Sequence, residues 1–555
     1  MTIDEKLGQM VQAERKTVDK GDIAKYFLGS VLSGGGSAPG DGSPSAWADM
    51  TDAMHAEAKT TRLGIPLLYG SDAVHGHNNV AGATIFPHQI GLGCANDPAL
   101  VTEIARAVAE EVAATGVDWT FAPLVGPARD PRWGRTYETF GEDPVLTSRL
   151  GAAAIKGFQS KVMACAKHFA GDGLTSMSTS SVDAGLLDRG DVKLDDALFR
   201  KLAIEPYKEA IAANVASIMV SFNSVRGEKM HASKRFVTDV LKRELGFQGI
   251  VISDWSGLRE LPGTYYEQVV ASVNAGIDVT MDAENHQWRE FLSTAKTAVE
   301  KGAISQARVD DAVRRVLTVK CERGAFEKGP VNRKELARIG SQEHRDLARR
   351  AARASFVLLT NDGNTLPLAS TQRVHVSGSG ANSLARQMGG WTIDWQGGEG
   401  KKLTGTTITA GLGEHLAKDP ASADVELVVI SEAPYAEWFG DRQTLDIAPD
   451  DVKALDAASA TKRPVIAVIL SGRPLAFRPH VQKAKVWIAA WLFGSEGGAI
   501  ADVLYGVAPI NGRLAHAWPK DGDLLDRRKS VAEPWNAEAL LFPVGFGVPL
   551  AARAK

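Results

Sequence analysis

Short apolar runs alternate with longer amphipathic stretches from about residue 29 to about residue 320. Each apolar run has the length of a buried strand, and the stretches between them have the periodicity of surface helices. The runs are GSVLSG, IPLLYGSD, VDWTFAP, VMACAKHF, ASIMVSF, GIVISD and GIDVTMD, and LDDALFRKLAIEPYKEAI is one helical stretch. Repeated strand and helix over this length predicts a (β/α) barrel or a large doubly wound sheet.

A charged stretch, CERGAFEKGPVNRKELARIGSQEHRD, interrupts this alternation and has the composition of a linker. After it, SFVLLTN, RVHVSG, VELVVI, PVIAVILSG and KVWIAAW have the pattern of buried parallel strands separated by helices. We therefore predict an α/β fold with a barrel domain over residues 1–322, a linker over 323–344 and a second α/β domain over 345–555.

The composition excludes some classes of partner. The formal net charge of −3 lacks the basic excess that binding to nucleic acid phosphates needs. No run of eighteen apolar residues is present, so a membrane-spanning helix is not expected. Thr2 and Glu5 have capping-box spacing before an apolar stripe, so residues 2–14 are predicted as a folded helix and not as a signal peptide.

Polar residues gather at the ends of the predicted strands. In a barrel, the carboxyl ends of the strands line the active site, which makes these side chains candidates for function. They are Asp72, Lys167, His168, Asn223 and Asp254. An aspartate after a strand is also a common helix N-cap, so Asp254 alone is ambiguous. Hydrolysis of a glycosidic bond commonly needs two carboxyl groups in different environments, one ionised and one protonated.

Five blocks of the sequence carry a resemblance to a known family. They are YGSDAVHGHNNVAGATIFPHQIGLG, RDPRWGRTYETFGEDP, AKHFAGDG, KMHASKRFVTDVLKRELGFQGIVISDW and GGWTIDWQG. In this order they resemble the exo-acting β-glucosidase and β-glucan exohydrolase (1,3/1,4-β-glucan glucohydrolase) branch of glycoside hydrolase family 3. The resemblance implies a (β/α)8 TIM-like barrel followed by an (α/β) sandwich, with the active site between them.

The resemblance also implies roles for single residues. Asp254 matches the family nucleophile, which forms a covalent glycosyl-enzyme, and Trp255 and Trp391 match two aromatic walls around the leaving sugar. Glu432, directly after the strand VELVVI, matches the general acid/base, and Glu437 in the same loop is the alternative. The residues that match the glucose-binding set are Asp72, Arg135, Lys167 and His168.

Several positions depart from the plant-like members of this family. Phe222 stands where a tyrosine is expected near the nucleophile, which removes one hydrogen bond to Asp254. Glu260 stands where an arginine is expected, with Arg259 beside it. An acidic sugar contact is missing near Ser181 unless Asp183 replaces it. These changes predict weaker or broader activity.

The predicted function is a retaining exo-β-glucosidase that releases glucose from the non-reducing end of β-glucosides or β-glucan oligosaccharides. One alternative is a β-N-acetylhexosaminidase of the same superfamily, although its catalytic histidine falls at Asp172 here. Another is a sugar-binding protein with weakened catalysis. No cofactor and no metal are expected, since His75 and His77 lack a completing ligand set. We expect no nucleic acid or membrane partner, a monomer or homodimer, and the periplasmic or secreted location of the family.

Overall fold

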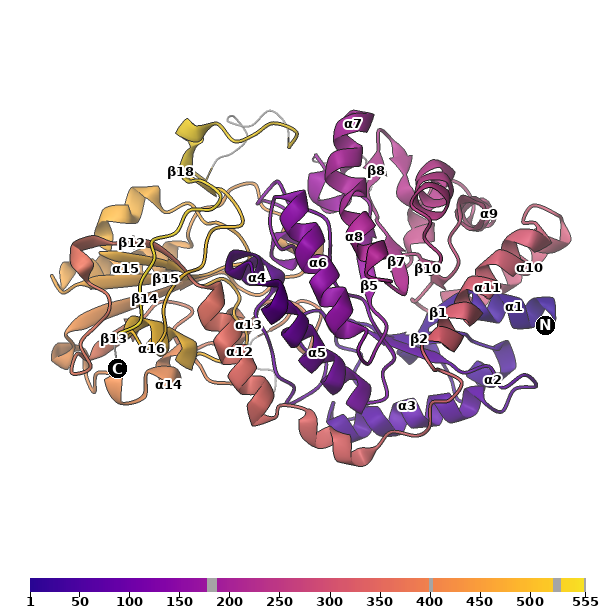
Figure 1. Cartoon of the computed structure of the whole chain (residues 1–555), viewed down its shortest axis with the longest axis horizontal. Coiled ribbons are helices and arrows are strands. Elements are labelled where there is room, and N and C mark those ends of the chain that lie inside the picture. Colours follow the sequence, from indigo (N-terminus) through magenta and orange to yellow (C-terminus); the bar gives the residue numbers. More distant parts are fainter. Residues whose placement is uncertain (177–186, 399–402, 523–530, 554–555) are drawn as a thin grey trace. The chain divides into compact units, whose positions relative to one another are not determined.

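The computed structural model describes residues 1–176, 187–398, 403–522 and 531–553 (Figure 1). They form two compact units, each built from more than one segment. The first unit comprises residues 1–80, 105–126 and 151–339, and the second comprises 81–104, 127–150 and 340–555. Residues 81–104 and 127–150 therefore pack with the C-terminal part of the chain, although both precede residue 322 in the sequence.

Parallel strands of the first unit close into a ring. A five-stranded sheet has the order β11-β1-β2-β3-β4, and a three-stranded sheet has the order β10-β7-β5. Parallel bridges Trp119–Met163 and Leu124–Lys167 join β4 to β5, and the bridge Ile252–Val279 joins β10 to β11. The strands of this (β/α) barrel are β1 (Val11–Glu14), β2 (Ser30–Ser33), β3 (Leu68–Ser71), β4 (Trp119–Thr120), β5 (Cys165–Phe169), β7 (Ser217–Val220), β10 (Ile250–Ile252) and β11 (Thr280–Met281).

Helices follow the barrel strands as the alternation predicts. In Figure 1, α1 (Ile3–Gln9), α10 (Gln287–Glu300) and α11 (Gln306–Glu322) lie side by side, and α1 contacts both of the others. Other helices of the unit are α2 (Asp22–Tyr26), α3 (Pro44–Ala58), α7 (Asp196–Phe199), α8 (Pro206–Ala212) and α9 (Tyr265–Ala275). Buried strand side chains such as Leu32, Trp119 and Ile252 pack with Val316 of α11 in one hydrophobic core.

The first barrel strand is a correction to the sequence analysis. The capping box of Thr2 and Glu5 is present, which confirms the start of helix α1. The helix ends at Gln9, however, and residues 11–14 form β1 instead of continuing the helix. Pairing of β1 with β2 and β11 outweighs the local helical pattern, because a strand of four residues carries almost no periodic signal of its own.

Two buried lysines hold the amino-terminal ends of the barrel strands. Nζ of Lys320 donates to Oε1 of Gln9 at 2.6 Å and to the backbone oxygens of Gly29 at 3.0 Å and Pro66 at 2.7 Å. These three acceptors shortly precede β1, β2 and β3. Burial lowers the pKa of Lys320 to about 7, although Asp118 opposes this shift.

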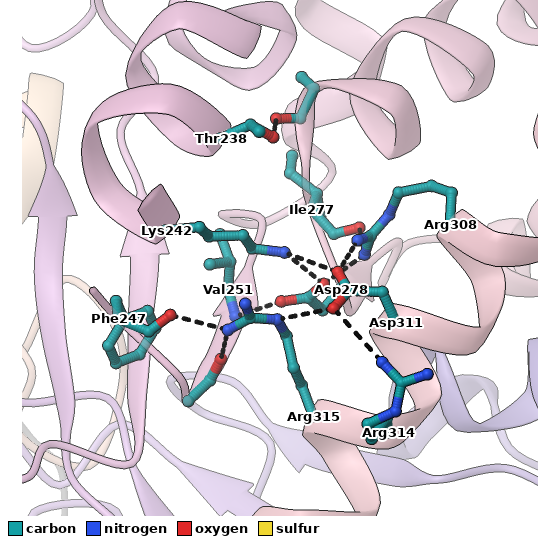
Figure 2. A network of polar contacts seen from close by, with 12 residues as sticks. Thr238, Lys242, Phe247, Val251, Ile277, Asp278, Arg308, Asp311, Arg314 and Arg315 are labelled. Carbon is teal, nitrogen blue, oxygen red and sulfur yellow. Dashed lines mark hydrogen bonds and ion pairs between the residues drawn. The ribbon is translucent and has the colours of Figure 1, made fainter. Parts of the chain in front are cut away.

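The second lysine, Lys242, takes part in an ionic cluster before β11 (Figure 2). Its Nζ lies 2.7 Å from Oδ1 of the fully buried Asp278, and Arg308 of α11 reaches the same carboxylate. The other oxygen of Asp278 accepts from the backbone N–H of Val251 at 3.0 Å. The cluster thereby links α11, β10 and the segment before β11. Contacts at the amino-terminal end of the barrel strands serve stability and not catalysis.

The second unit contains a five-stranded sheet of order β12-β16-β15-β14-β13. Strands β13 (Val374–Ser377), β14 (Val425–Ser431), β15 (Val465–Leu470) and β16 (Val486–Ala489) run parallel, as predicted. β12 (Val357–Asn361) was predicted to be parallel as well but pairs antiparallel with β16. Its pattern could not reveal direction, because a buried edge strand is apolar in either orientation.

Helices cover both faces of this sheet. In Figure 1, α15 (Pro449–Ala460) lies on one side, and α14 (Ile408–Leu412) and α16 (Gly498–Leu504) lie on the other. Alternate residues of β14, Val425, Leu427 and Val429, share a core with Ile408 and Ile500 of those two helices. All residues of β14 are buried, as a sheet between two layers of helices requires. Of the helices in the described ranges, none is long and apolar enough to cross a membrane.

Candidate active site

Asp254 lies in a tight turn directly after β10. Its backbone oxygen accepts from the N–H of Gly257 at 3.0 Å, and Ser256 has a left-handed φ of 49°. The N–H of Trp255 donates to Oδ1 of Asp254 at 2.7 Å, so one oxygen of the carboxylate is fixed by the backbone. The side chain is also largely buried.

His231 supports the backbone of Asp254 from within the unit. The N–H of Asp254 donates to Nε2 of His231 at 3.1 Å. Burial lowers the pKa of His231 to about 3, and the charges of Lys229 and Arg189 act in the same direction. The ring is therefore a neutral acceptor. A Cβ atom at Gly257 would lie 2.4 Å from Nε2 of His231, so this position has room only for glycine.

His168 in β5 lies between two carboxylates. Its Nδ1 is 2.6 Å from Oδ2 of Asp172, and its Nε2 is 3.6 Å from Oδ2 of Asp254. All three side chains are buried. Because Asp172 occupies Nδ1, it orients the ring so that Nε2 faces Asp254.

Lys167 and Asp72 belong to the same end of the barrel. Lys167 is buried in β5, and Asp72 follows β3 directly. The thiol of Cys165 experiences the charges of Lys167, Asp254 and Asp72 together, while burial is the main reason that its pKa rises to about 12. The structure thus brings the four barrel candidates Asp72, Lys167, His168 and Asp254 to one place. Asn223 instead donates to the backbone oxygens of Ala170 and Ser224, which is a structural role.

Trp255 packs over a glycine of the GGG sequence at residues 34–36. A Cβ atom at Gly34 would lie 2.8 Å from the Trp255 ring. The indole N–H donates to Oε1 of Glu284 at 3.0 Å. The close approach of the ring therefore explains why residue 34, directly after β2, is glycine. Trp255 itself is partly buried and directly follows Asp254.

The positions that depart from the plant-like pattern form a connected group. Phe222 is buried between the ring of His231, at 5.8 Å between centroids, and the guanidinium of Arg189, at 4.4 Å. Arg189 also pairs with Glu260, and Nζ of Lys229 lies 3.5 Å from the same carboxylate. Arg259 turns away to Asp282 and Glu290. Ser181 and Asp183 lie outside the described residues.

Arg135 belongs to the second unit. Its guanidinium pairs in bidentate fashion with Glu138, at 3.0 and 2.9 Å, and Nη1 donates to Oε1 of Glu437 at 3.2 Å. Trp391 is 5% exposed, and its indole N–H donates to Oε1 of Glu138 at 3.1 Å. Glu138 therefore connects three of the residues singled out from the sequence: Arg135, Trp391 and, through Arg135, Glu437.

Glu432 occupies a separate, crowded position at the end of β14. Its Oε2 accepts from the hydroxyl of Tyr435 at 2.9 Å and from the N–H of Gly472 at 3.0 Å. Its Oε1 accepts from Arg442 at 3.0 Å and lies 3.2 Å from Nε of the fully buried Arg473. Three hydrogen-bond donors and the guanidinium of Arg473 therefore occupy both oxygens of this carboxylate.

Several residues of these clusters were not singled out from the sequence. Asp172 and His231 were part of the blocks that carry the resemblance, but the spacing gave no reason to select them. Glu138 contacts Arg135 three residues away but also Trp391 far along the chain, and Arg473 contacts Glu432 and Tyr435, which are also distant in the sequence.

Comparisons with known proteins agree with this architecture. Residues 2–319 match the family model for the glycosyl hydrolase family 3 N terminal domain, and residues 356–549 match the model for its C-terminal domain. A lysosomal beta glucosidase of Dictyostelium discoideum is 32% identical over 94% of this chain and 71% of its own length. A periplasmic beta-glucosidase of Salmonella typhimurium is 31% identical over 99% of this chain and 79% of its own length.

Solved structures give the same result. The crystal structure of an exo-1,3/1,4-beta-glucanase from a Pseudoalteromonas species has a TM-score of 0.90 at 38% identity, covering 99% of this chain and 73% of that one. A beta-glucosidase from Listeria innocua in complex with isofagomine has a TM-score of 0.84 at 27% identity, covering 99% of this chain and 81% of that one. The chain belongs to glycosyl hydrolase family 3 and is a glycoside hydrolase.

Proposed function

We propose that this glycoside hydrolase is a retaining exo-β-glucosidase with Asp254 as its nucleophile. The observation that carries the proposal is the geometry of the Asp254 carboxylate. One oxygen is held by the N–H of Trp255, and the other faces Nε2 of His168 at the carboxyl end of the barrel. A carboxylate fixed in this way is poised to act on a ring bound at that end.

In the proposed reaction, Oδ2 of Asp254 attacks the anomeric carbon as the bond to the leaving oxygen breaks. A glutamic acid transfers its proton to that oxygen, and the glycosyl-enzyme ester forms. The same glutamate then takes a proton from water, which attacks the anomeric carbon and releases Asp254. The sugar emerges with its anomeric configuration retained.

The glucose-binding set follows from the chemistry of its members. Asp72 accepts from sugar hydroxyls, and Lys167 and His168 donate to them, so convergent charge-assisted bonds fix one ring in one orientation. Arg135 is proposed as a further donor from the second unit. Solved structures of the Listeria innocua β-glucosidase contain glucose and, in a mutant, laminaribiose, which supports a neutral β-glucoside as the substrate.

The donors around Glu432 favour Glu437 as the general acid/base, which reverses the order expected from the sequence. A general acid must direct a carboxyl oxygen at the leaving group, whereas both oxygens of Glu432 are occupied by partners within the unit. Glu437 has a left-handed φ of 55°, a conformation that non-glycine residues adopt at a cost and that is frequent at functional sites. Glu432 would then anchor the loop that carries Glu437.

Two alternative functions differ from this proposal. A β-N-acetylhexosaminidase with a catalytic histidine at position 172 is disfavoured, because Asp172 here orients His168. A sugar-binding protein without catalysis would hold the same sugar but not turn it over. The periplasmic or secreted location and the monomer or homodimer stay predictions. Two bacterial relatives, from Salmonella typhimurium and Dickeya chrysanthemi, are named as periplasmic.

The test is release of nitrophenol from an aryl β-glucoside by the wild type, by Asp254→Ala and by the surface variant Asp239→Ala. We expect activity in the wild type and in Asp239→Ala, and its loss in Asp254→Ala. NMR of the first product should show retention, and inversion would contradict the covalent route. Binding of glucose without turnover by the wild type would support the sugar-binding alternative.

A further inference from the structure

Tyr137 is a fully buried tyrosine of the second unit that the proposed reaction does not use. It lies in the 3-10 helix η2 (Thr136–Glu138), two residues after Arg135. Its hydroxyl donates to the backbone oxygen of Tyr435 at 2.7 Å, and the two rings meet edge to face with their centroids 5.5 Å apart. Tyr435 lies two residues before Glu437. The hydroxyl of Tyr137 therefore reaches the loop that carries the proposed general acid.

The backbone of Glu437 has to be held by its surroundings. Its left-handed φ of 55° is costly for a residue with a side chain, and such conformations persist only where neighbouring contacts enforce them. Before Glu437, the hydroxyl of Tyr137 binds Tyr435. The side-chain amide of Gln396 donates to the backbone oxygen of Ala436 at 3.2 Å and accepts from its N–H at 2.9 Å. These bonds fix the two residues that precede Glu437.

Arg473 holds the other end of the same loop. Its guanidinium, fully buried, donates to the backbone oxygen of Gly440 at 2.6 Å. The same group donates to the backbone oxygens of Pro131 and Arg132 at 3.1 and 2.9 Å. One buried cation thus joins the end of the acid loop to the segment that carries Tyr137.

The two segments also meet backbone to backbone at Gly134. A Cβ atom there would lie 1.8 Å from the backbone oxygen of Glu437, so no side chain fits. The N–H of Gly134 donates to Oδ1 of Asp441 at 2.7 Å. Arg135 follows Gly134 and donates to Oε1 of Glu437 at 3.2 Å. A proposed sugar donor and the proposed acid are therefore held together by one set of contacts.

Tyr505 provides a comparison within the same unit. It is also buried, and it directly follows α16. Its hydroxyl donates to the backbone oxygen of Gln372 at 2.9 Å, a residue that lies two positions before β13 and outside the acid loop. Tyr137 and Tyr505 thus make the same kind of hydrogen bond, but only the bond of Tyr137 reaches the acid loop.

We propose that Tyr137 is a positioning residue for the general acid, and that its hydroxyl fixes the loop of Glu437 in the conformation needed for proton transfer to the leaving oxygen. The inference rests on the proposed function and deepens it. Removal of the hydroxyl leaves the carboxyl group of Glu437 in place but less firmly oriented. It should therefore impair the steps in which that group transfers a proton.

The experiment compares Tyr137→Phe with the wild type on phenyl β-glucoside and on dinitrophenyl β-glucoside. Dinitrophenolate leaves with little protonation, whereas phenolate is a poor leaving group and needs the acid. We expect the phenyl-to-dinitrophenyl ratio of kcat/KM to fall roughly tenfold, which is part of the hundredfold or more that a general acid contributes. Tyr505→Phe is the matched control. It should lower the thermal midpoint as much as Tyr137→Phe does but leave the ratio unchanged.

An unchanged ratio in Tyr137→Phe, or an equal fall on both substrates, would overturn the proposal. The same fall of the ratio in Tyr505→Phe would also overturn it, because the effect would then follow lost stability. A lower ratio in Tyr137→Phe together with the wild-type ratio in Glu437→Ala would overturn the assignment of Tyr137 to Glu437.

If the wild type hydrolyses no β-glucoside, the proposed function fails separately. Amide hydrogen exchange over residues 432–442 then decides whether Tyr137 holds this loop. We expect faster exchange in Tyr137→Phe than in the wild type and in Tyr505→Phe. Equal exchange in the three proteins would overturn the role of Tyr137.

Discussion

The backbone N–H of Asp254 donates a hydrogen bond of 3.1 Å to Nε2 of His231. Burial keeps His231 neutral, with a pKa of about 3, so this acceptor persists throughout the pH range in which a glycosidase is assayed. The hydrogen bond fixes the turn that aims the carboxylate, and Gly257 leaves the space that His231 occupies. The orientation of Asp254 thus depends on two residues that need not touch the substrate.

Gly257→Ala should therefore impair catalysis. The new methyl group would displace His231 and with it the backbone of Asp254, and a misplacement of about 1 Å costs on the order of a hundredfold in rate. The measurement is kcat/KM on an aryl β-glucoside together with the thermal midpoint. Gly329→Ala is the matched control, because a Cβ atom there meets no neighbour. Equal activity of the two variants would contradict the role of His231.

Glu437→Ala should affect mainly activity, whereas Glu432→Ala should affect mainly stability. Glu437→Ala is expected to keep part of its activity on substrates with good leaving groups, which need little protonation, and azide should rescue it. Glu432→Ala should lower the free energy of unfolding by about 3 kcal/mol, because it leaves the buried Arg473 without this carboxylate. The assays are turnover with aryl glucosides of graded leaving-group pKa and urea denaturation. Azide rescue of Glu432→Ala alone would restore Glu432 as the acid.

Asp172→Asn should reduce activity with little loss of stability. The carboxylate bonded to Nδ1 of His168 orients the ring toward Asp254, and an amide cannot provide the same charge. Loss of one charge-assisted hydrogen bond corresponds to roughly a tenfold fall in kcat/KM. Separate kcat and KM values with the aryl glucoside, compared with those of the surface variant Asp195→Asn, test this. Parallel losses of activity and thermal stability would instead indicate a purely structural Asp172.

Lys320 should make stability depend on pH. Its pKa is about 7 in the folded protein and near 10.5 in the unfolded chain, so the unfolded chain binds more protons between these values. The free energy of unfolding should therefore rise with pH in this window, by at most about 1.4 kcal/mol per pH unit from this group. Lys320→Met should have a smaller slope in urea titrations, and Lys161→Met, at an exposed site, should keep the wild-type slope. Equal slopes in all three proteins would refute the assignment.

The barrel strands after residue 29 were predictable because each is a buried apolar run between two amphipathic helical stretches. The runs that contain β2, β5 and β10 confirm this directly. β1 was missed, because four residues after a capped helix carry no distinguishing period. The direction of β12 was missed because its apolar sequence is equally compatible with parallel and antiparallel pairing.

The order of residues along the chain is enough to specify which chemical groups stand at the barrel end. Asp72 and Asp254 follow their strands, Lys167 and His168 lie within β5, and parallel strands carry such residues to the same edge. How each group is held becomes defined only in the folded chain: His168 by Asp172, Asp254 by His231, and Glu432 by two arginines. Asp172 lies four residues from His168, whereas His231 lies 23 residues from Asp254. Whether a carboxyl group is ionised or holds a proton depends on such partners. The spacing of residues along the sequence does not reveal which partners these will be.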